Sequence, residues 1–287
     1  MIRLYTLLLF IGTSLQLTAQ FDFEAAETDL AFYADVMVNA MEPAHRERAY
    51  NAFNEQFEEV LSQGGSYMYK FEKLKWISFV EAPDESFRFI SWQLTGLGNT
   101  YQYKSYYQND DNLIELKNTI DFGRNVEFEG MNPDRWFGRL IYDITAVDDY
   151  YLLFGFRQLD EFTKTKSVEI FKKNGNQLIF GNPVFSSSDS KYAENKSRIV
   201  LTYSADAAAT INFNPGLNMI VFDHVIPRMG RMLGQGETFL PDGSYEAYKL
   251  ENGKWEHVEQ LYTELIDKPK VGSRKETRDI QGKLKKN

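Results

Sequence analysis

The sequence predicts a mainly β protein with a small helical part at its N-terminus. Aromatic residues make up 15% of the chain, and such residues are enriched in strands. From Ser66 onward, apolar and polar residues alternate in short runs that turn residues separate. Before Ser66, apolar residues recur every three or four positions, which is the spacing of an amphipathic helix.

The first residues are typical of a secretory signal peptide. Arg3 precedes a short apolar stretch, and Leu17-Thr18-Ala19 offers a cleavage site. The apolar stretch is too short to span a membrane. We therefore expect removal of residues 1–19 on export and a periplasmic or secreted mature chain without a transmembrane segment. Cysteine is absent, which excludes disulfides and thiolate chemistry.

Two helices joined by a tight link are predicted within residues 20–65. Apolar side chains recur at helical spacing from Glu24 to Ala40, and Pro43 fits the first turn of a second helix. A Gly-Gly pair marks its end. The second helix carries an aromatic stripe that includes Phe53 and Phe57. This stripe must be covered by the rest of the chain, which we expect, or by another protein.

Residues 66–265 are predicted to form an antiparallel β domain of three similar four-stranded units. The strands are expected at 74–80, 87–92, 101–107 and 113–116, then at 139–144, 151–156, 167–171 and 177–180, and finally at 199–204, 219–224, 245–250 and 254–259. Four-stranded meanders are the blades of a propeller. The same pattern also fits one large twisted sheet, a sandwich or a barrel.

Charge is unevenly distributed along the chain, whose net charge is −9. Residues 268–287 contain eight Lys or Arg and two acidic residues, so the remainder is strongly acidic. An acidic body argues against nucleic acid as a partner. We expect residues 266–287 to form a disordered basic tail that serves solubility, with contact to anionic lipid or an acidic protein as the alternative.

The segment Phe222–Gly243 is the main candidate for a functional site. It continues the second strand of the third unit, and its link to the next strand is about ten residues longer than in the other units. Long loops on a rigid β scaffold often carry function. Asp223 and His224 are neighbours in a strand and point to opposite faces, which argues against a catalytic pair. The alternative is a hydrogen-bonded histidine at a strand end, followed by a flexible loop.

Two arginines and several glycines follow in the same segment. Arg228 and Arg231 could flank an anion together with loop amides at Gly230, Gly234 and Gly236. The glycine spacing matches neither a phosphate loop nor a dinucleotide fingerprint. We therefore expect these residues to contribute to a binding surface.

Other chemistry has little support in the sequence. The three histidines are not at metal-ligand spacing, and no G-x-S-x-G motif is present. The sequence thus predicts no metal, no cofactor and no catalytic nucleophile. Trp136, in the connection between the first two units, is a further candidate contact residue, with packing on the sheet as its alternative role.

Several stretches resemble secreted proteins of the Bacteroidota that have no known activity. These stretches are the TAQ end of the signal, EPAHRERAYNAF, FDHVIP and PDGSYEAYKLENGKW. The resemblance implies an envelope or secreted protein and assigns no catalytic residue.

We expect an exported, non-enzymatic binding or scaffold protein of the bacterial envelope that contacts an envelope protein or glycan through strand-end loops. The alternative is a hydrolase of envelope glycans or anionic substrates that uses His224 with an acid from elsewhere in the chain. The sequence makes no prediction of oligomeric state.

Overall fold

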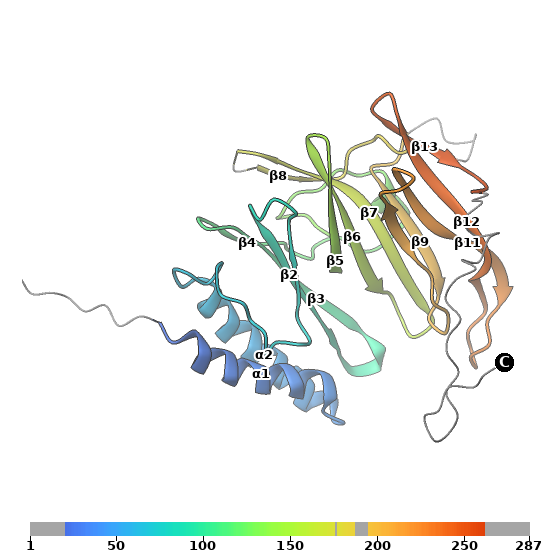
Figure 1. The fold of residues 1–287 in the computed structure, drawn as a ribbon. Coiled ribbons are helices and arrows are strands. Elements are labelled where there is room, and N and C mark those ends of the chain that lie inside the picture. The colour runs from blue at the N-terminus through green and yellow to red at the C-terminus, as the bar shows by residue number, and fades with distance from the viewer. Residues whose placement is uncertain (1–20, 176, 187–194, 262–287) are drawn as a thin grey trace, which may run out of the picture.

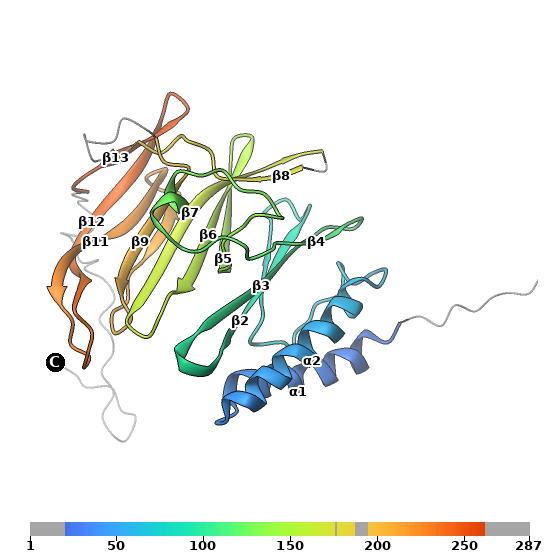
Figure 2. The ribbon, with the colours of Figure 1, turned by 180° about the vertical axis from the view of Figure 1, so that it is seen from behind.

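The protein is a stack of four layers, one of helices and three of antiparallel sheet (Figure 1). The computed structural model describes residues 21–175, 177–186 and 195–261. The expected signal peptide (1–19) and basic tail (266–287) lie outside the described residues. The layers follow one another in chain order, and the view from behind shows the same succession (Figure 2). The predicted fold class, mainly β with an N-terminal helical hairpin, is confirmed.

The helical layer consists of α1 (Phe23–Asn39) and α2 (Pro43–Leu61). The side chain of Asp22 caps α1 by accepting a hydrogen bond from the Ala25 amide at 3.0 Å. Phe53 and Phe57 are fully buried against Trp92 of the first sheet, so the chain itself covers the aromatic stripe. In the described part of the chain, neither helix combines the length and apolar character needed to cross a membrane.

The strands form three separate sheets. Sheet 1 contains β1 (Ser78–Glu81), β2 (Arg88–Thr95), β3 (Tyr101–Gln108) and β4 (Leu113–Glu115). Sheet 2 contains β5 (Leu140–Val147), β6 (Tyr150–Gln158), β7 (Thr163–Asn174), β8 (Gln177–Phe180) and β9 (Arg198–Ser204). Sheet 3 contains β10 (Ile211–Asn214), β11 (Met219–Met229), β12 (Glu237–Glu251) and β13 (Lys254–Val258). Each sheet has the order of a four-stranded meander, with β9 added to sheet 2.

The prediction for the third unit is wrong at its first strand. The segment predicted to open that unit is β9, which instead pairs with β7 over Thr163–Glu169. The remaining part of β7 pairs with β8, so the two strands share one edge of this long strand. The first strand of sheet 3 is β10, which a Pro-Gly turn connects to β11. A strand pattern specifies an apolar face but not its partner, and the length of β7 allows it to take two.

Each pair of neighbouring layers encloses its own apolar core. One core lies between the helices and sheet 1, a second between sheets 1 and 2, and a third between sheets 2 and 3. Hydrogen bonds also link sheets 1 and 2 at the start of β5. The Ile141 amide donates to Ser91 Oγ at 2.9 Å, and the Ser78 hydroxyl donates to the Ile141 carbonyl at 2.6 Å. The layers therefore form one continuous body.

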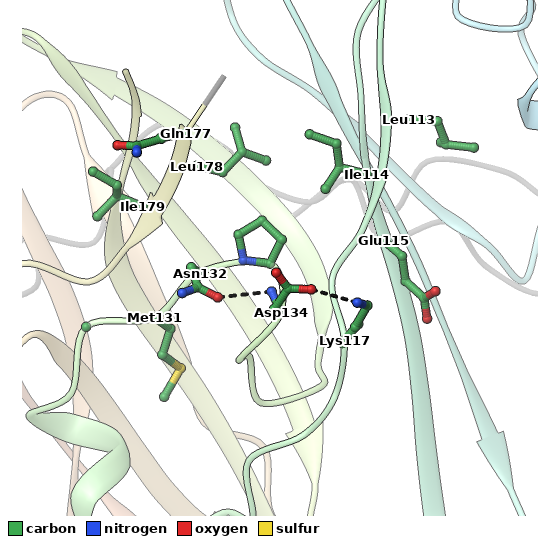
Figure 3. Close-up of a pocket in the computed structure, with 12 residues that line it drawn as sticks. Leu113, Ile114, Glu115, Lys117, Met131, Asn132, Asp134, Gln177, Leu178 and Ile179 are labelled. Carbon is green, nitrogen blue, oxygen red and sulfur yellow. Dashed lines mark hydrogen bonds and ion pairs between the residues drawn. The ribbon is translucent and has the colours of Figure 1, made fainter. Parts of the chain in front are cut away.

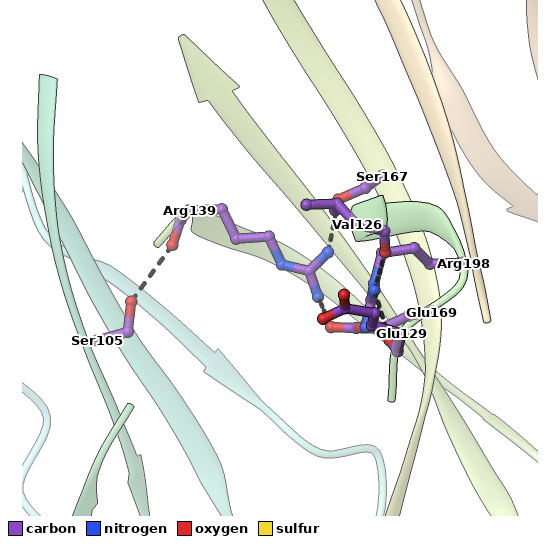
Figure 4. A network of polar contacts seen from close by, with 7 residues as sticks. All are labelled: Ser105, Val126, Glu129, Arg139, Ser167, Glu169 and Arg198. Atoms are coloured by element: carbon purple, nitrogen blue, oxygen red, sulfur yellow. Dashed lines mark hydrogen bonds and ion pairs between the residues drawn. The ribbon is translucent and has the colours of Figure 1, made fainter. Parts of the chain in front are cut away.

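A buried ion network lies at the join of sheets 1 and 2 (Figure 4). Glu169 on β7 pairs with Arg139 through one carboxylate oxygen and with Arg198 of β9 through the other, and all three side chains have no exposed surface. Arg139 also donates to Ser167 Oγ at 2.5 Å, and its guanidinium lies 4.8 Å from the ring of Phe137. Burial lowers the pKa of Arg139, and the Glu169 carboxylate opposes that shift.

Candidate functional site

The segment Phe222–Gly243 forms a two-stranded ribbon with a short end loop. β11 and β12 remain paired as far as Met229 and Glu237, so only residues 230–236 lie outside the strands. The prediction of a long loop is therefore wrong, since most of this segment is paired strand. The prediction failed because β11 and β12 resume pairing after a bulge, so both strands extend beyond the part of sheet 3 that β10 and β13 flank.

Two prolines are compatible with this ribbon because no strand of the described chain pairs with its outer edges. β10 pairs with β11 only as far as Phe222, and β13 pairs with β12 only from Ala247 onward. Pro227 and Pro241 lie beyond both limits, where a strand needs no donor on its outer side. The prolines thus mark the part of the ribbon that leaves the sheet.

The bulge places a histidine opposite an acidic loop of the partner strand. The register shifts between Asp223 and Val225, so His224 alone faces residues 242–244. Gly243 accommodates the bulge with a φ of +91°. Asp242 and Gly243 are therefore part of this bulge within β12. Bulges bend a strand and redirect its side chains, as here for His224.

An acid–histidine cluster crosses three strands of sheet 3 and consists of Asp242, His224, Glu246 and His257. His224 Nδ1 lies 3.0 Å from Asp242 Oδ2, and its Nε2 lies 3.6 Å from Glu246 Oε1. On the far side, Glu246 Oε2 lies 2.5 Å from His257 Nε2. Within the described ranges, no group of three or more acidic or histidine side chains has a metal-binding arrangement.

Asp242 is held as a carboxylate by its neighbours. The Ser244 hydroxyl and amide donate to Asp242 Oδ1 at 2.7 and 2.9 Å, and together with His224 they lower the pKa of Asp242 to about 2. An aspartate on Nδ1 orients a histidine as in general-base sites. Here the Ser244 hydroxyl is directed to the carboxylate, while His224 Nε2 faces a second acid.

Asp223 lies apart from this cluster. Its Oδ2 accepts hydrogen bonds from the Thr210 amide at 2.5 Å and from the Thr210 hydroxyl at 2.7 Å, and the residue is buried. Asp223 thus fastens the start of β10 to β11. Asp223 and His224 have separate partners, in agreement with the alternation expected in a strand.

The end loop of the ribbon is tied to sheet 2. Gln235 is buried, and its amide group donates to Ser204 Oγ at 2.7 Å. The Gly230 amide donates to the Gly236 carbonyl at 2.8 Å, and Gly234 takes a left-handed φ of +83°. A side chain at Gly230 would collide with Gln235, since an added Cβ would lie 2.4 Å from its Cγ. These glycines therefore shape the loop.

The ribbon end presents an apolar and basic surface, here named the tip surface, formed by Arg228, Met229, Arg231, Leu233 and Phe239. Leu233 is fully exposed, and Met229 is 75% exposed. Met229 and Phe239 share one face of the ribbon, because Phe239 pairs with the residue two positions before Met229. Both arginines are exposed, and neither has an ion-pair partner among the described residues.

The Trp136 side chain lies in the interior of the protein. It has no exposed area and packs in the core between sheets 1 and 2, 5.9 Å from Phe180 between ring centroids. The guanidinium of Arg139 lies 5.4 Å from its ring. This placement corresponds to the packing role and gives no support to a contact role.

A groove of about 780 Å³ opens between the edges of sheets 1 and 2 (Figure 3). β4 forms one wall, β8 forms the other, and residues 130–134 form the closed end. Asp134 pairs with Lys117 at 2.6 Å across that end. Sequence analysis missed this groove, because the two walls come from different units and nothing in either strand identifies the other.

Sequence analysis also missed the acidic partners of His224. A His and an Asp that are 18 residues apart have no recognisable spacing, and only the register of β11 with β12 joins them. Comparison of the chain with family models, with curated proteins and with solved structures found no match.

Proposed function

We propose that this chain is an exported binding protein of the bacterial envelope that contacts a partner protein through the tip surface. The observation that carries the proposal is the exposure of Met229, Leu233 and Phe239 at the end of an anchored ribbon. Export rests on the signal-like N-terminus and is part of the proposal.

The composition of the tip surface favours protein contact. Contiguous exposed apolar side chains mark interaction sites, and aromatic residues, Met and Arg are enriched at the centre of interfaces. Anchoring by Gln235 lowers the entropy that would be lost on binding, since the end loop is already ordered. Two arginines without an acidic partner in the described chain favour a partner with carboxylates around an apolar contact.

Site-specific photo-crosslinking in the native host tests this proposal. A photoreactive amino acid replaces Leu233 in one strain and Met68 in the other. Met68 is a matched control, since it is also an exposed apolar residue, at 73%, and lies away from the ribbon. We expect a discrete adduct from position 233 and none from position 68.

Charge reversal provides the second arm. Arg228→Glu together with Arg231→Glu should weaken the adduct at position 233, whereas Lys75→Glu together with Lys173→Glu, at two exposed lysines away from the ribbon, should leave it unchanged. Equal adducts at positions 233 and 68, or an adduct indifferent to the arginine substitutions, would refute the tip surface as the contact.

The Asp242–His224 contact favours a second candidate, a hydrolase of envelope glycans or anionic substrates with His224 as the general base. The test is hydrolysis of envelope glycan preparations by the purified chain. Activity that His224→Ala abolishes and that the arginine double variant retains would favour this candidate over binding. Activity that persists in His224→Ala would eliminate it.

A further inference from the structure

The groove between β4 and β8 is bounded by two strand edges with unpaired backbone groups. β4 pairs with β3 on one side, and β8 pairs with β7 on one side. Apart from the bridge at Phe180, the described residues provide no strand for the other edge of either. Exposed edges of this kind are templates for another extended chain.

The hydrogen bonds at the end of β4 identify which of its backbone amides and carbonyls point away from β3 and into the groove. The Leu116 amide donates to the Ser105 carbonyl of β3 at 2.8 Å, so residue 116 faces the sheet. The Lys117 amide faces the opposite way and donates to the Pro133 carbonyl at 2.7 Å. Because direction alternates along a strand, Leu113 and Glu115 direct their amides and carbonyls outward, as Lys117 does. In the described chain, the amides and carbonyls of Leu113 and Glu115 have no backbone hydrogen-bond partner.

On the β8 wall, backbone groups of alternate residues likewise point away from the neighbouring strand. Phe180 exchanges two backbone hydrogen bonds with Met131, at 2.7 and 2.9 Å, on the side away from β7. By the same alternation, Leu178 directs its amide and carbonyl outward, toward the open part of the groove. Both walls thus offer backbone donors and acceptors to the same space.

The chain itself fills the closed end of this groove with a tight turn, in which Asn132 and Arg135 exchange backbone hydrogen bonds. Residues 131–136 leave Phe180 of β8 and reach the continuation of β4, where the Trp136 amide donates to the Lys117 carbonyl at 3.1 Å. Figure 3 shows this segment between the two walls, with Asn132 and Asp134 at the turn. The turn in this segment ends its hydrogen bonding to the continuation of β4 at Lys117, before Glu115. In the rest of the groove, no segment of the described chain pairs with the outer edge of β4.

Side chains give the slot an apolar lining with a polar rim. Ile114 and Leu178 belong to the core between sheets 1 and 2 and also line the groove. Ile179, at 41% exposure, extends this lining toward solvent, and Lys117 and Asp134 pair at the rim. An extended segment with alternating apolar and polar residues matches such a slot, because successive side chains point to opposite faces.

We infer that this groove binds an extended segment of a partner polypeptide, which adds as a strand to the outer edge of β4 with alternate apolar side chains on Ile114 and Leu178. Main-chain hydrogen bonds to Leu113 and Glu115 supply affinity, and the lining selects the alternating pattern. This surface is separate from the tip surface, and the inference stands without the proposed function.

The test uses a phage-displayed library of random peptides roughly nine residues long, about the length of a long strand. The best peptide is then synthesised, with a second version that is N-methylated at alternate amides. N-methylation blocks backbone hydrogen bonds and leaves every side chain in place. We expect the enriched peptides to alternate apolar and polar residues, and the methylated version to bind roughly tenfold or more weakly.

Glu115→Pro is the matching change in the protein. Proline removes the outward amide hydrogen of residue 115 and no hydrogen bond to β3, and an edge strand tolerates it. Glu115→Gln is the control, because both variants lose the ion pair with Lys104 while only one loses the amide donor. We expect roughly tenfold weaker peptide binding by Glu115→Pro than by Glu115→Gln. Bound peptide should also slow hydrogen exchange across residues 113–117.

Several results would overturn the inference. These are no enrichment of peptides, equal binding of the methylated peptide, or equal binding by Glu115→Pro when it melts like Glu115→Gln. If Glu115→Pro fails to fold, the methylated peptide decides alone. A concentration-dependent dimer that Glu115→Pro abolishes would overturn the identity of the partner, since a second copy would then be the occupant.

Discussion

Asp242 Oδ2 lies 3.0 Å from His224 Nδ1, and this contact spans the bulge that separates the ribbon from the rest of sheet 3. On one side of this contact, residues 225–229 of β11 and 237–241 of β12 form a ribbon that no other described strand flanks. On the other side, β10 and β13 extend the sheet. The contact therefore fastens the ribbon where it leaves the sheet.

Asp242→Asn should reduce stability in a way that depends on pH. The pKa of Asp242 is lowered from 3.8 to about 2, chiefly by the Ser244 hydroxyl and amide and also by His224. A lowered pKa contributes stability that is complete above about pH 4 and is lost as the pH falls toward about 2. The urea midpoints of wild type and Asp242→Asn should thus differ at neutral pH and converge in acid.

Ser244→Ala checks the cause of that shift. Without the hydroxyl, the pKa of Asp242 rises toward 3.8, so the loss of stability in acid should be smaller and should be complete at a higher pH than in wild type. A difference between wild type and Asp242→Asn that is constant down to about pH 2 would contradict the assignment.

Glu169→Gln should be among the most damaging single substitutions. It leaves the buried guanidinium groups of Arg139 and Arg198 without a counter-charge, and breaking such a buried pair costs about 3–5 kcal/mol. Asp149→Asn, which removes an exposed ion pair with Lys172 on the same strand, should change little. Urea unfolding followed by tryptophan fluorescence measures both. Equal midpoints for the two variants would show that the buried network contributes no more than a surface pair.

Gly155→Ala should destabilise the protein through collision with Arg139. An added Cβ at Gly155 would lie 2.4 Å from Cδ and 2.7 Å from Nε of that arginine. Overpacking of this kind typically costs about 1–3 kcal/mol. Gly123→Ala is the control, because nothing lies within 4 Å of an added Cβ there. Thermal unfolding that is the same in both alanine variants would mean that the Arg139 side chain moves aside at no cost.

Phe57→Ala tests the join between the helices and sheet 1. The Phe57 ring is fully buried, with centroids 5.3 Å from Phe71 and 5.6 Å from Trp92. Its removal should cost about 3–5 kcal/mol, whereas Phe32→Ala, at a position that is 65% exposed, should have little effect. A change in Trp92 fluorescence should accompany the first variant. Similar unfolding of both variants would show that α2 is not integral to the fold.

Sequence patterns predicted the elements well where one face of an element is buried. The apolar spacing after Glu24 and the proline at position 43 predicted α1 and α2 to within a few residues. The alternating runs of the first two units correspond to β1–β4 and β5–β8. These patterns are local, because burial of one face imposes its period on the sequence of that element.

Strand partners were harder to predict. β9 has the apolar pattern of a first strand, yet it joins sheet 2, and the short β10 takes its predicted place. A Pro-Gly pair at 215–216 was an available turn signal for β10. The choice between β7 and β11 as the partner of β9 depends on contacts between residues far apart in the chain.

The sequence by itself determined the helical start, the antiparallel meanders and the alternation that separates Asp223 from His224. Period and turn residues are local properties, and local energetics is sufficient to impose them. Only the tertiary structure decided that His224 meets Asp242, that Trp136 is buried against Arg139, and that β4 faces β8 across a groove. Each depends on register or on packing between layers, which side chains from several distant segments determine together.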